Sequence, residues 1–137
     1  MAKLSLLDGI PGVPKIINPK QHAVLDALTT GYFLVVAGLL WNKNRRGGIA
    51  ALVNGVFVAG MSALTDYNGT GEKPISFRTH GKLDEVQAAM AAGAPSVLRF
   101  TRGSAFFRGQ AANEVMVIAI TDWDAGESVT RRLRRVA

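Results

Sequence analysis

Two histidine–aspartate pairs, repeated along the chain, are the residues best suited to chemistry. His22 stands four residues before Asp26, and His80 stands four residues before Asp84. Residues four apart share one face of a helix, so each pair presents an imidazole beside a carboxylate. Such groups can ligate a haem or a chlorophyll-type pigment, hold a metal ion, or begin a path for protons or ions. The competing interpretation is a structural network of polar groups.

Two further aspartates, Asp66 and Asp122, close the apolar segments that follow. A helix dipole disfavours negative charge at its C-terminus, so we expect a histidine nearby to compensate. The expected pairings are His22 with Asp26 or Asp66, and His80 with Asp84 or Asp122. All six residues are expected near helix ends rather than at the centre of a membrane, which favours the structural network. A tetrapyrrole held by His22 and His80 is the second interpretation, and we assign no residue as a dedicated metal ligand.

The elements that position these residues are predicted from hydropathy. Of 137 residues, 48% are hydrophobic and 19% charged, which is typical of a folded chain. The chain has no cysteine, which excludes disulfides and thiol catalysis. Its net charge of +6 lies outside two apolar runs, residues 23–41, whose one charge is Asp26, and residues 47–65, which carry none. Each run has about 19 residues, enough for a helix to cross a bilayer.

An internal repeat predicts that the second half of the chain is a second helical hairpin. His22 and Asp26 recur 58 residues later as His80 and Asp84, and residues 64–67 (Leu-Thr-Asp-Tyr) recur 56 residues later as Ile-Thr-Asp-Trp. Asn18 and Ser76 stand at equivalent positions, and both are good helix N-caps. The predicted helices of the second half span residues 77–100 and 106–123, with a kink or break at Pro95.

The predicted fold is therefore an all-α membrane protein of four transmembrane helices, arranged as two tandem hairpins. The expected segments are an N-terminal segment (1–17), hairpin one (18–67), a linker (68–75), hairpin two (76–123) and a basic tail (124–137). The alternative is that the second half lies at the membrane surface or forms a soluble cap. Tyr67, Trp123 and Trp41 are expected in the aromatic belts of the bilayer.

One segment resembles a known family. Residues 94–100, Ala-Pro-Ser-Val-Leu-Arg-Phe, are similar to the Ser-Pro-Trp-x-Leu-Gly-Phe motif of the SPW-repeat family. The proline and the Leu-x-Phe positions are kept, whereas the tryptophan is absent and Arg99 replaces the glycine. The first half retains only Gly-Leu-Leu-Trp, at residues 38–41. The resemblance implies a small bacterial membrane protein built from paired helices, and it implies no activity.

Small residues and the basic tail predict what the protein contacts. A small residue recurs every four positions in the second apolar run, which predicts a helix-packing ridge made of Gly47, Ala51, Gly55, Ala59 and Ala63. Asn54 is expected to form an interhelical hydrogen bond, and Glu114 to pair with one of the arginines at 99, 102 and 108. The basic tail predicts contact with anionic lipids through Arg131, Arg132, Arg134 and Arg135.

The sequence has none of the common catalytic signatures, such as a phosphate-binding loop or H-E-x-x-H, so we expect a protein that is not an enzyme. The leading interpretation is a membrane-embedded structural or accessory subunit that assembles with itself or with a larger complex. The alternatives are a haem- or pigment-binding protein and a small oligomeric transporter or channel. We expect no nucleic-acid partner. The resemblance implies a bacterial protein, and we expect it in the inner membrane. Because ten of sixteen Lys and Arg residues lie on the side of the termini, we expect cytoplasmic termini, although the short, wholly basic hairpin turns favour the opposite orientation.

Overall fold

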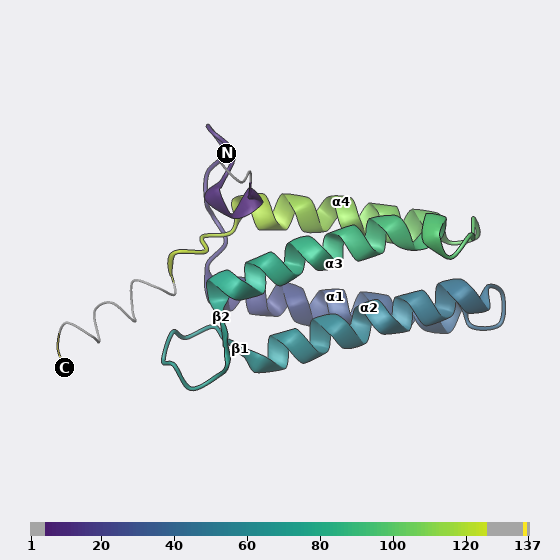
Figure 1. Cartoon of the computed structure of the whole chain (residues 1–137), viewed down its shortest axis with the longest axis horizontal. Helices are drawn as coiled ribbons and strands as arrows, with labels where there is room; N and C mark the ends of the chain where they lie inside the picture. The colour runs from purple at the N-terminus through teal and green to yellow at the C-terminus, as the bar shows by residue number, and fades with distance from the viewer. Residues whose placement is uncertain (1–4, 126–135, 137) are drawn as a thin grey trace.

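The computed structural model describes residues 5–125 and residue 136, and over this range the chain is all-helical. Four helices lie side by side along one axis: α1 (Pro19–Leu40), α2 (Arg45–Leu64), α3 (Phe77–Val97) and α4 (Ser104–Ile120) (Figure 1). A single 3₁₀ turn, η1 (Leu6–Asp8), precedes them. The four tail arginines predicted to contact lipid lie outside the described residues.

The helices begin where the sequence predicts. Asn18 caps α1 through a reciprocal pair of hydrogen bonds with Gln21, and Ser76 caps α3 by accepting from the Thr79 amide. The predicted break at Pro95 is wrong, since α3 runs two residues beyond it. Pro95 stands in the last turn, where its missing amide costs a single hydrogen bond before the helix ends anyway.

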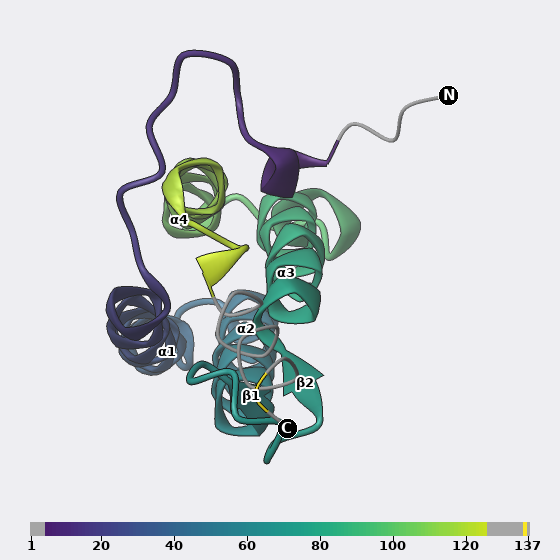
Figure 2. The ribbon, with the colours of Figure 1, turned by 90° about the vertical axis from the view of Figure 1, so that its left-hand side faces the viewer.

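The two hairpins are joined through their ends. Thr65–Asp66 (β1), after α2, pairs in parallel with Ile75–Ser76 (β2), before α3. In the same way Thr121, after α4, pairs with Ile17, before α1. The end of each hairpin thus contacts the start of the other, as expected of two related halves that face each other. Viewed end-on, the helices follow the order α1, α2, α3, α4 around the bundle, and the N-terminal segment passes over α4 to reach α1 (Figure 2).

In the half of the bundle nearer the start of α1, the distribution of polarity is reversed relative to a water-soluble bundle. Among the described residues, eleven polar or charged residues are buried beside eighteen hydrophobic ones, and the polar set includes His22, Asp84 and Glu114, whereas apolar side chains such as Val24, Leu28 and Val56 are at least 59% exposed. Polar interiors and apolar surfaces are the opposite of what water selects. Two helices, α1 and α2, are long and apolar enough to cross a membrane.

The predicted small-residue ridge on α2 is buried over only part of its length. Gly47, Ala51 and Gly55 are buried, and a Cβ at Gly55 would lie 3.3 Å from Phe33 Cβ on α1. Ala59 and Ala63 are exposed, so the ridge packs within this chain only over its first part, and contact of the rest with a partner stays a prediction. Because a helix turns about 100° per residue, a stripe of every fourth residue drifts about 40° at each step and leaves the interface.

Candidate functional site

Both histidine–aspartate pairs meet in one buried cluster at the end of the bundle that holds the termini. We call His22, Asp26, His80 and Asp84 the His–Asp cluster. The Nε2 atom of His22 lies 3.3 Å from Asp26 Oδ1 and 3.0 Å from Asp84 Oδ2. The Nε2 atom of His80 lies 3.1 Å from Asp26 Oδ2 and 3.3 Å from Asp84 Oδ1. Each imidazole therefore faces both carboxylates, and each carboxylate faces both imidazoles.

The cluster occupies equivalent places in the two hairpins. Each histidine is the fourth residue of its helix, and each aspartate follows one turn later. All four side chains are 5% exposed or less. Charged groups buried to this degree must be satisfied largely by one another, because they are removed from bulk water.

A threonine from the opposite hairpin fixes each imidazole. His22 Nδ1 lies 3.1 Å from the hydroxyl of Thr121, and His80 Nδ1 lies 2.7 Å from that of Thr65. Each hydroxyl already donates its hydrogen to a helix carbonyl, Val117 O for Thr121 and Met61 O for Thr65. The threonine oxygen must then accept from the imidazole, so Nδ1 of each ring carries a proton. Nε2 faces the carboxylates, which only accept hydrogen bonds: the Nε2–H of a charged ring donates to them, as from His22 to Asp84, whereas a neutral ring has at Nε2 a lone pair that can bind a cation.

The two aspartates differ in their remaining contacts. Tyr67 donates a hydrogen bond to Asp26 Oδ2. Burial, followed by the negative charge of Asp26, raises the pKa of Tyr67 well above its usual range, so the phenol stays protonated and can donate. The repeat places Trp123 opposite Tyr67, but its Nε1 donates to Ile118 O instead. Asp84 Oδ1 and His80 Nε2 consequently make no hydrogen bond of acceptable geometry.

The structure places the other two predicted aspartates elsewhere. Asp66 and Asp122 contact neither histidine among the described residues. Asp66 instead organises the linker: slight burial opposes its ionisation, but hydrogen bonds from the Gly71 and Thr70 amides outweigh this and lower the pKa of its carboxyl group. Asp122 accepts from the Asp124 amide. Local amide donors therefore satisfy both residues, and no histidine is needed to offset their charge.

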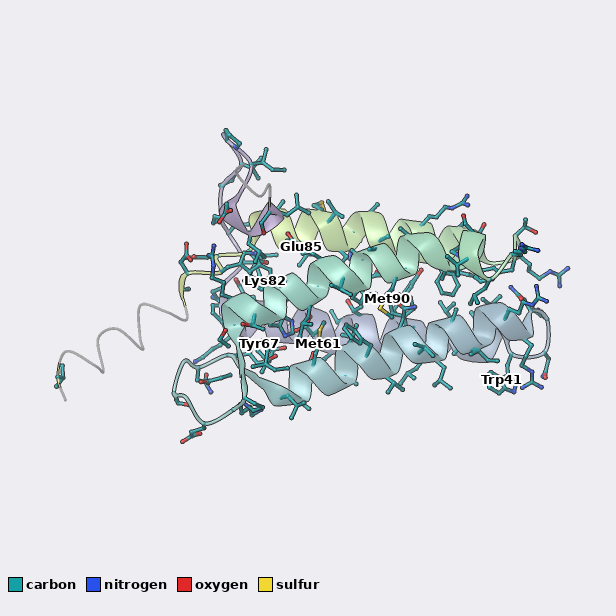
Figure 3. The ribbon with its side chains drawn as sticks, viewed as in Figure 1. Trp41, Met61, Tyr67, Lys82, Glu85 and Met90 are labelled. Atoms are coloured by element: carbon teal, nitrogen blue, oxygen red, sulfur yellow. The ribbon has the colours of Figure 1, made fainter. Side chains whose placement is uncertain are left out.

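Aromatic and aliphatic side chains cover the cluster on the side of the chain termini. The Trp123 ring lies 4.8 Å from the His22 ring and 4.7 Å from the Phe77 ring, and Leu7 of η1 packs against them. Trp123 is 1% exposed, so its predicted place in an aromatic belt is wrong. Glu85 holds η1 by accepting from the Leu6 amide, and it lies beside the N-terminal segment in Figure 3. The cover closes this end of the bundle over the cluster.

Gly81 makes this cover possible, which gives a stability prediction. A Cβ at Gly81 would lie 2.5 Å from Leu7 Cδ2 and 2.8 Å from the Trp123 ring. We expect Gly81→Ala to destabilise the protein by about 1–3 kcal/mol, measured by thermal unfolding in detergent. Gly93→Ala is the matched control on the same helix, since a Cβ there meets nothing within 4 Å. It should be neutral or mildly stabilising, and equal losses in both variants would refute the role of Gly81.

A polar crevice leads from the cluster to the outside between α1 and α4. Its volume is about 220 Å³, and its lining includes Asp26, Thr29, Gln110 and Glu114. The amide of Gln110 donates to Thr29 at 3.3 Å and to Glu114 at 3.5 Å. Glu114 is therefore held by Gln110 rather than by the arginines that the sequence suggested. The crevice provides a route by which water or an ion could reach Asp26.

Beyond the crevice, one further polar pair is followed by an apolar core that closes the interior. Gln87 donates to Asn54 across α3 and α2 at 3.0 Å, which is the interhelical bond expected of Asn54. The half of the bundle nearer the hairpin turns is filled by a core that includes Phe33, Phe107 and Leu40. The Phe33 and Phe107 rings lie 6.1 Å apart. The polar interior thus extends through one half of the bundle and stops at this core.

Sequence reasoning did not identify the residues that support the cluster. Thr65 and Thr121 recur at equivalent places in the repeat, and that recurrence was a usable signal. Gln87 and Gln110 have no counterpart of the same type in the other half, so nothing in the sequence marks them.

The fold is a four-helix bundle, and the candidate site is a buried polar cluster near one end of it. Comparisons with protein-family models, with curated proteins and with solved structures find no match to this chain.

Proposed function

We propose that this chain is a four-span integral membrane protein that serves as a structural or accessory subunit, assembling with itself or with a larger membrane complex. The observation that supports it most is the reversed polarity: buried charged groups inside and exposed Val, Leu and Ile outside. Lipid tails can cover that apolar surface, whereas water would penalise it. The helices α1 and α2 have the required length and hydropathy. The 21 residues of α3 are also long enough, although its first turns carry charged residues, and the 17 residues of α4 would span a thinner layer.

Grooves on the outer surface support the assembly part of the proposal. One, of about 730 Å³, runs between α3 and α4 and is lined mainly by alanines, such as Ala88, Ala92 and Ala112. A second, of about 450 Å³, lies between α2 and α3 and includes Gly93 and Ala94. Small residues of this kind allow another membrane helix to approach closely. Both grooves use α3, which makes this helix the proposed contact for a neighbouring subunit.

The number of spans can be tested with single cysteines, because the chain has none of its own. Asn42→Cys reports the first hairpin turn, Thr101→Cys the second turn, and Thr70→Cys the linker. With a membrane-impermeant maleimide on intact cells and on permeabilised cells, we expect residues 42 and 101 to be labelled from one side and residue 70 from the other. Labelling of residues 70 and 101 from the same side would contradict four spans. Size in detergent, relative to 14.6 kDa for one chain, then tests assembly.

Two other functions have less support from the geometry. A haem or pigment between His22 and His80 would have to displace Asp26 and Asp84, since both Nε2 atoms face these carboxylates at 3.0–3.3 Å. A channel would need a continuous polar path, and the core around Phe33 and Phe107 interrupts it. An absorption band in the purified protein would favour the first alternative. Ion flux through reconstituted vesicles would favour the second.

The similarity of residues 94–100 to the SPW-repeat motif supports the same proposal, as a bacterial inner-membrane protein with paired helices. The excess of Lys and Arg on the side of the termini supports cytoplasmic termini. The cysteine labelling tests this orientation too, because residue 70 should then be reached only after the cells are permeabilised.

A further inference from the structure

We propose that the His–Asp cluster binds one divalent transition-metal ion, for which zinc is the suitable probe. The sequence alone gave no dedicated metal ligand, because it did not reveal that the two pairs meet. In the fold, one ligand atom from each of His22, Asp26, His80 and Asp84 lies within 4.8 Å of all the others. Two imidazole nitrogens with two carboxylate oxygens form a ligand set suited to zinc and its first-row neighbours.

The distances fit a metal polyhedron. Zinc bonds to nitrogen and oxygen are about 2.0–2.1 Å, so neighbouring ligands of a tetrahedral ion stand about 3.3–3.4 Å apart. The four His-to-Asp distances are 3.0, 3.1, 3.3 and 3.3 Å. These distances involve both oxygens of each carboxylate, and one ligand atom per residue lies within 4.8 Å of the others. An ion at the centre would therefore draw the most widely spaced ligands inward by up to about 0.7 Å each.

Two atoms of the cluster lack a hydrogen bond and are placed to serve as metal ligands. His80 Nε2 and Asp84 Oδ1 are fully buried, point into the cluster, and make no hydrogen bond of acceptable geometry. A closed ring of ion pairs would satisfy these two atoms, whereas a metal bond needs only the lone pairs they present. The neutral imidazoles, two carboxylates and a divalent ion sum to zero charge, which suits a site of low dielectric constant.

The surroundings are those of a metal site. Thr121 and Thr65 accept from the Nδ1 atoms, which orients each ring and leaves Nε2 free to bind. Tyr67 donates to Asp26 and so holds that carboxylate. The crevice between α1 and α4 reaches Asp26, which gives an ion a way in. The proposal therefore rests on contacts within the bundle, and it holds whether or not the bundle spans a membrane.

The amino-acid composition limits which residues can bind the metal. His22 and His80 are the only two histidines and there is no cysteine, so binding through imidazole or thiolate ligands must use this cluster. The full chain is purified in detergent without a polyhistidine tag, dialysed against Zn²⁺, and its metal content measured by mass spectrometry. We expect one zinc per chain. With Co²⁺ as a second probe, wild-type protein should show the intense visible bands of tetrahedral cobalt.

Variants then locate the ion. His80→Gln and Asp84→Asn should lose the stoichiometric metal, whereas the matched controls Asp66→Asn and Asp122→Asn should keep it. Thr65→Val removes only the partner of His80 Nδ1, and we expect it to weaken zinc binding by about 10- to 100-fold. Wild-type protein that takes up neither zinc nor cobalt would overturn the proposal and leave a ring of ion pairs. Metal retained by His80→Gln and Asp84→Asn would overturn it equally. The cobalt spectrum uses wild-type protein, so the test stands even if those variants do not fold.

Discussion

Asp84→Asn should cost about 3–5 kcal/mol in the free energy of unfolding, measured by thermal or denaturant unfolding in detergent. Asp84 is fully buried, and its carboxylate faces both histidines at 3.0 and 3.3 Å. Asparagine has nearly the same shape but removes one of the two negative charges that balance the positive charge between them, which is carried either by two protonated imidazoles or by a bound divalent ion. Removing one partner of a buried charged pair leaves the other charge uncompensated in a protein interior of low dielectric constant. The expected loss of stability is therefore large.

The control for this prediction is Asp122→Asn. Asp122 is also an aspartate of the second hairpin, but it is only partly buried and accepts from the Asp124 amide. Its replacement should change stability by no more than about 0.5 kcal/mol.

A second comparison is the double variant His22→Gln with Asp84→Asn, which removes one imidazole and one carboxylate of the cluster. Because the pair interacts directly, the double variant should lose less than the sum of the two single losses. Additive losses would show that the cluster is not coupled.

The part of this site that the sequence predicts is the part set by local spacing. Residues four apart share a helix face whatever the helix packs against, so each histidine lies beside its own aspartate, as the spacing of His22 and Asp26 requires. Asn18 and Ser76 cap their helices for the same local reason. The all-helical fold and the two hairpins follow from hydropathy and from the repeat.

What the sequence does not give is the contact between the halves. Pairing of His22 with Asp84, rather than with Asp66, depends on how the end of each hairpin crosses to the start of the other. The roles of Thr65 and Thr121 depend on the same crossing. The prediction for Trp123 failed because aromatic residues at helix ends favour interfaces only when nothing covers them. Here η1 and the space left by Gly81 bury the ring instead.

Trp123→Ala should be the most damaging apolar substitution, with an expected loss of about 3–5 kcal/mol. Trp123 is 1% exposed, packs on His22 and Phe77, and donates to Ile118 O. Alanine would leave a cavity between η1 and the cluster and would remove one of the two hydrogen bonds to the Ile118 carbonyl, which also accepts from the Thr121 amide. Water could then reach the imidazoles from the aqueous end, so the loss should exceed that of an ordinary core truncation that exposes no charged group.

Trp41→Ala is the matched control, because the chain has only these two tryptophans and they differ in surroundings. Trp41 is 37% exposed and lies at the opposite end of the bundle, where Arg45 stacks on its ring at 4.4 Å (Figure 3). Its replacement should cost about 1 kcal/mol or less. Each variant also isolates the fluorescence of the other ring, so Trp41→Ala should retain the blue-shifted emission of a buried indole and Trp123→Ala should not. Equal losses of stability in the two variants, or blue-shifted emission from Trp123→Ala and not from Trp41→Ala, would mean that Trp123 does not cover the cluster. The cluster would then be open to water from the side of the termini as well as through the crevice.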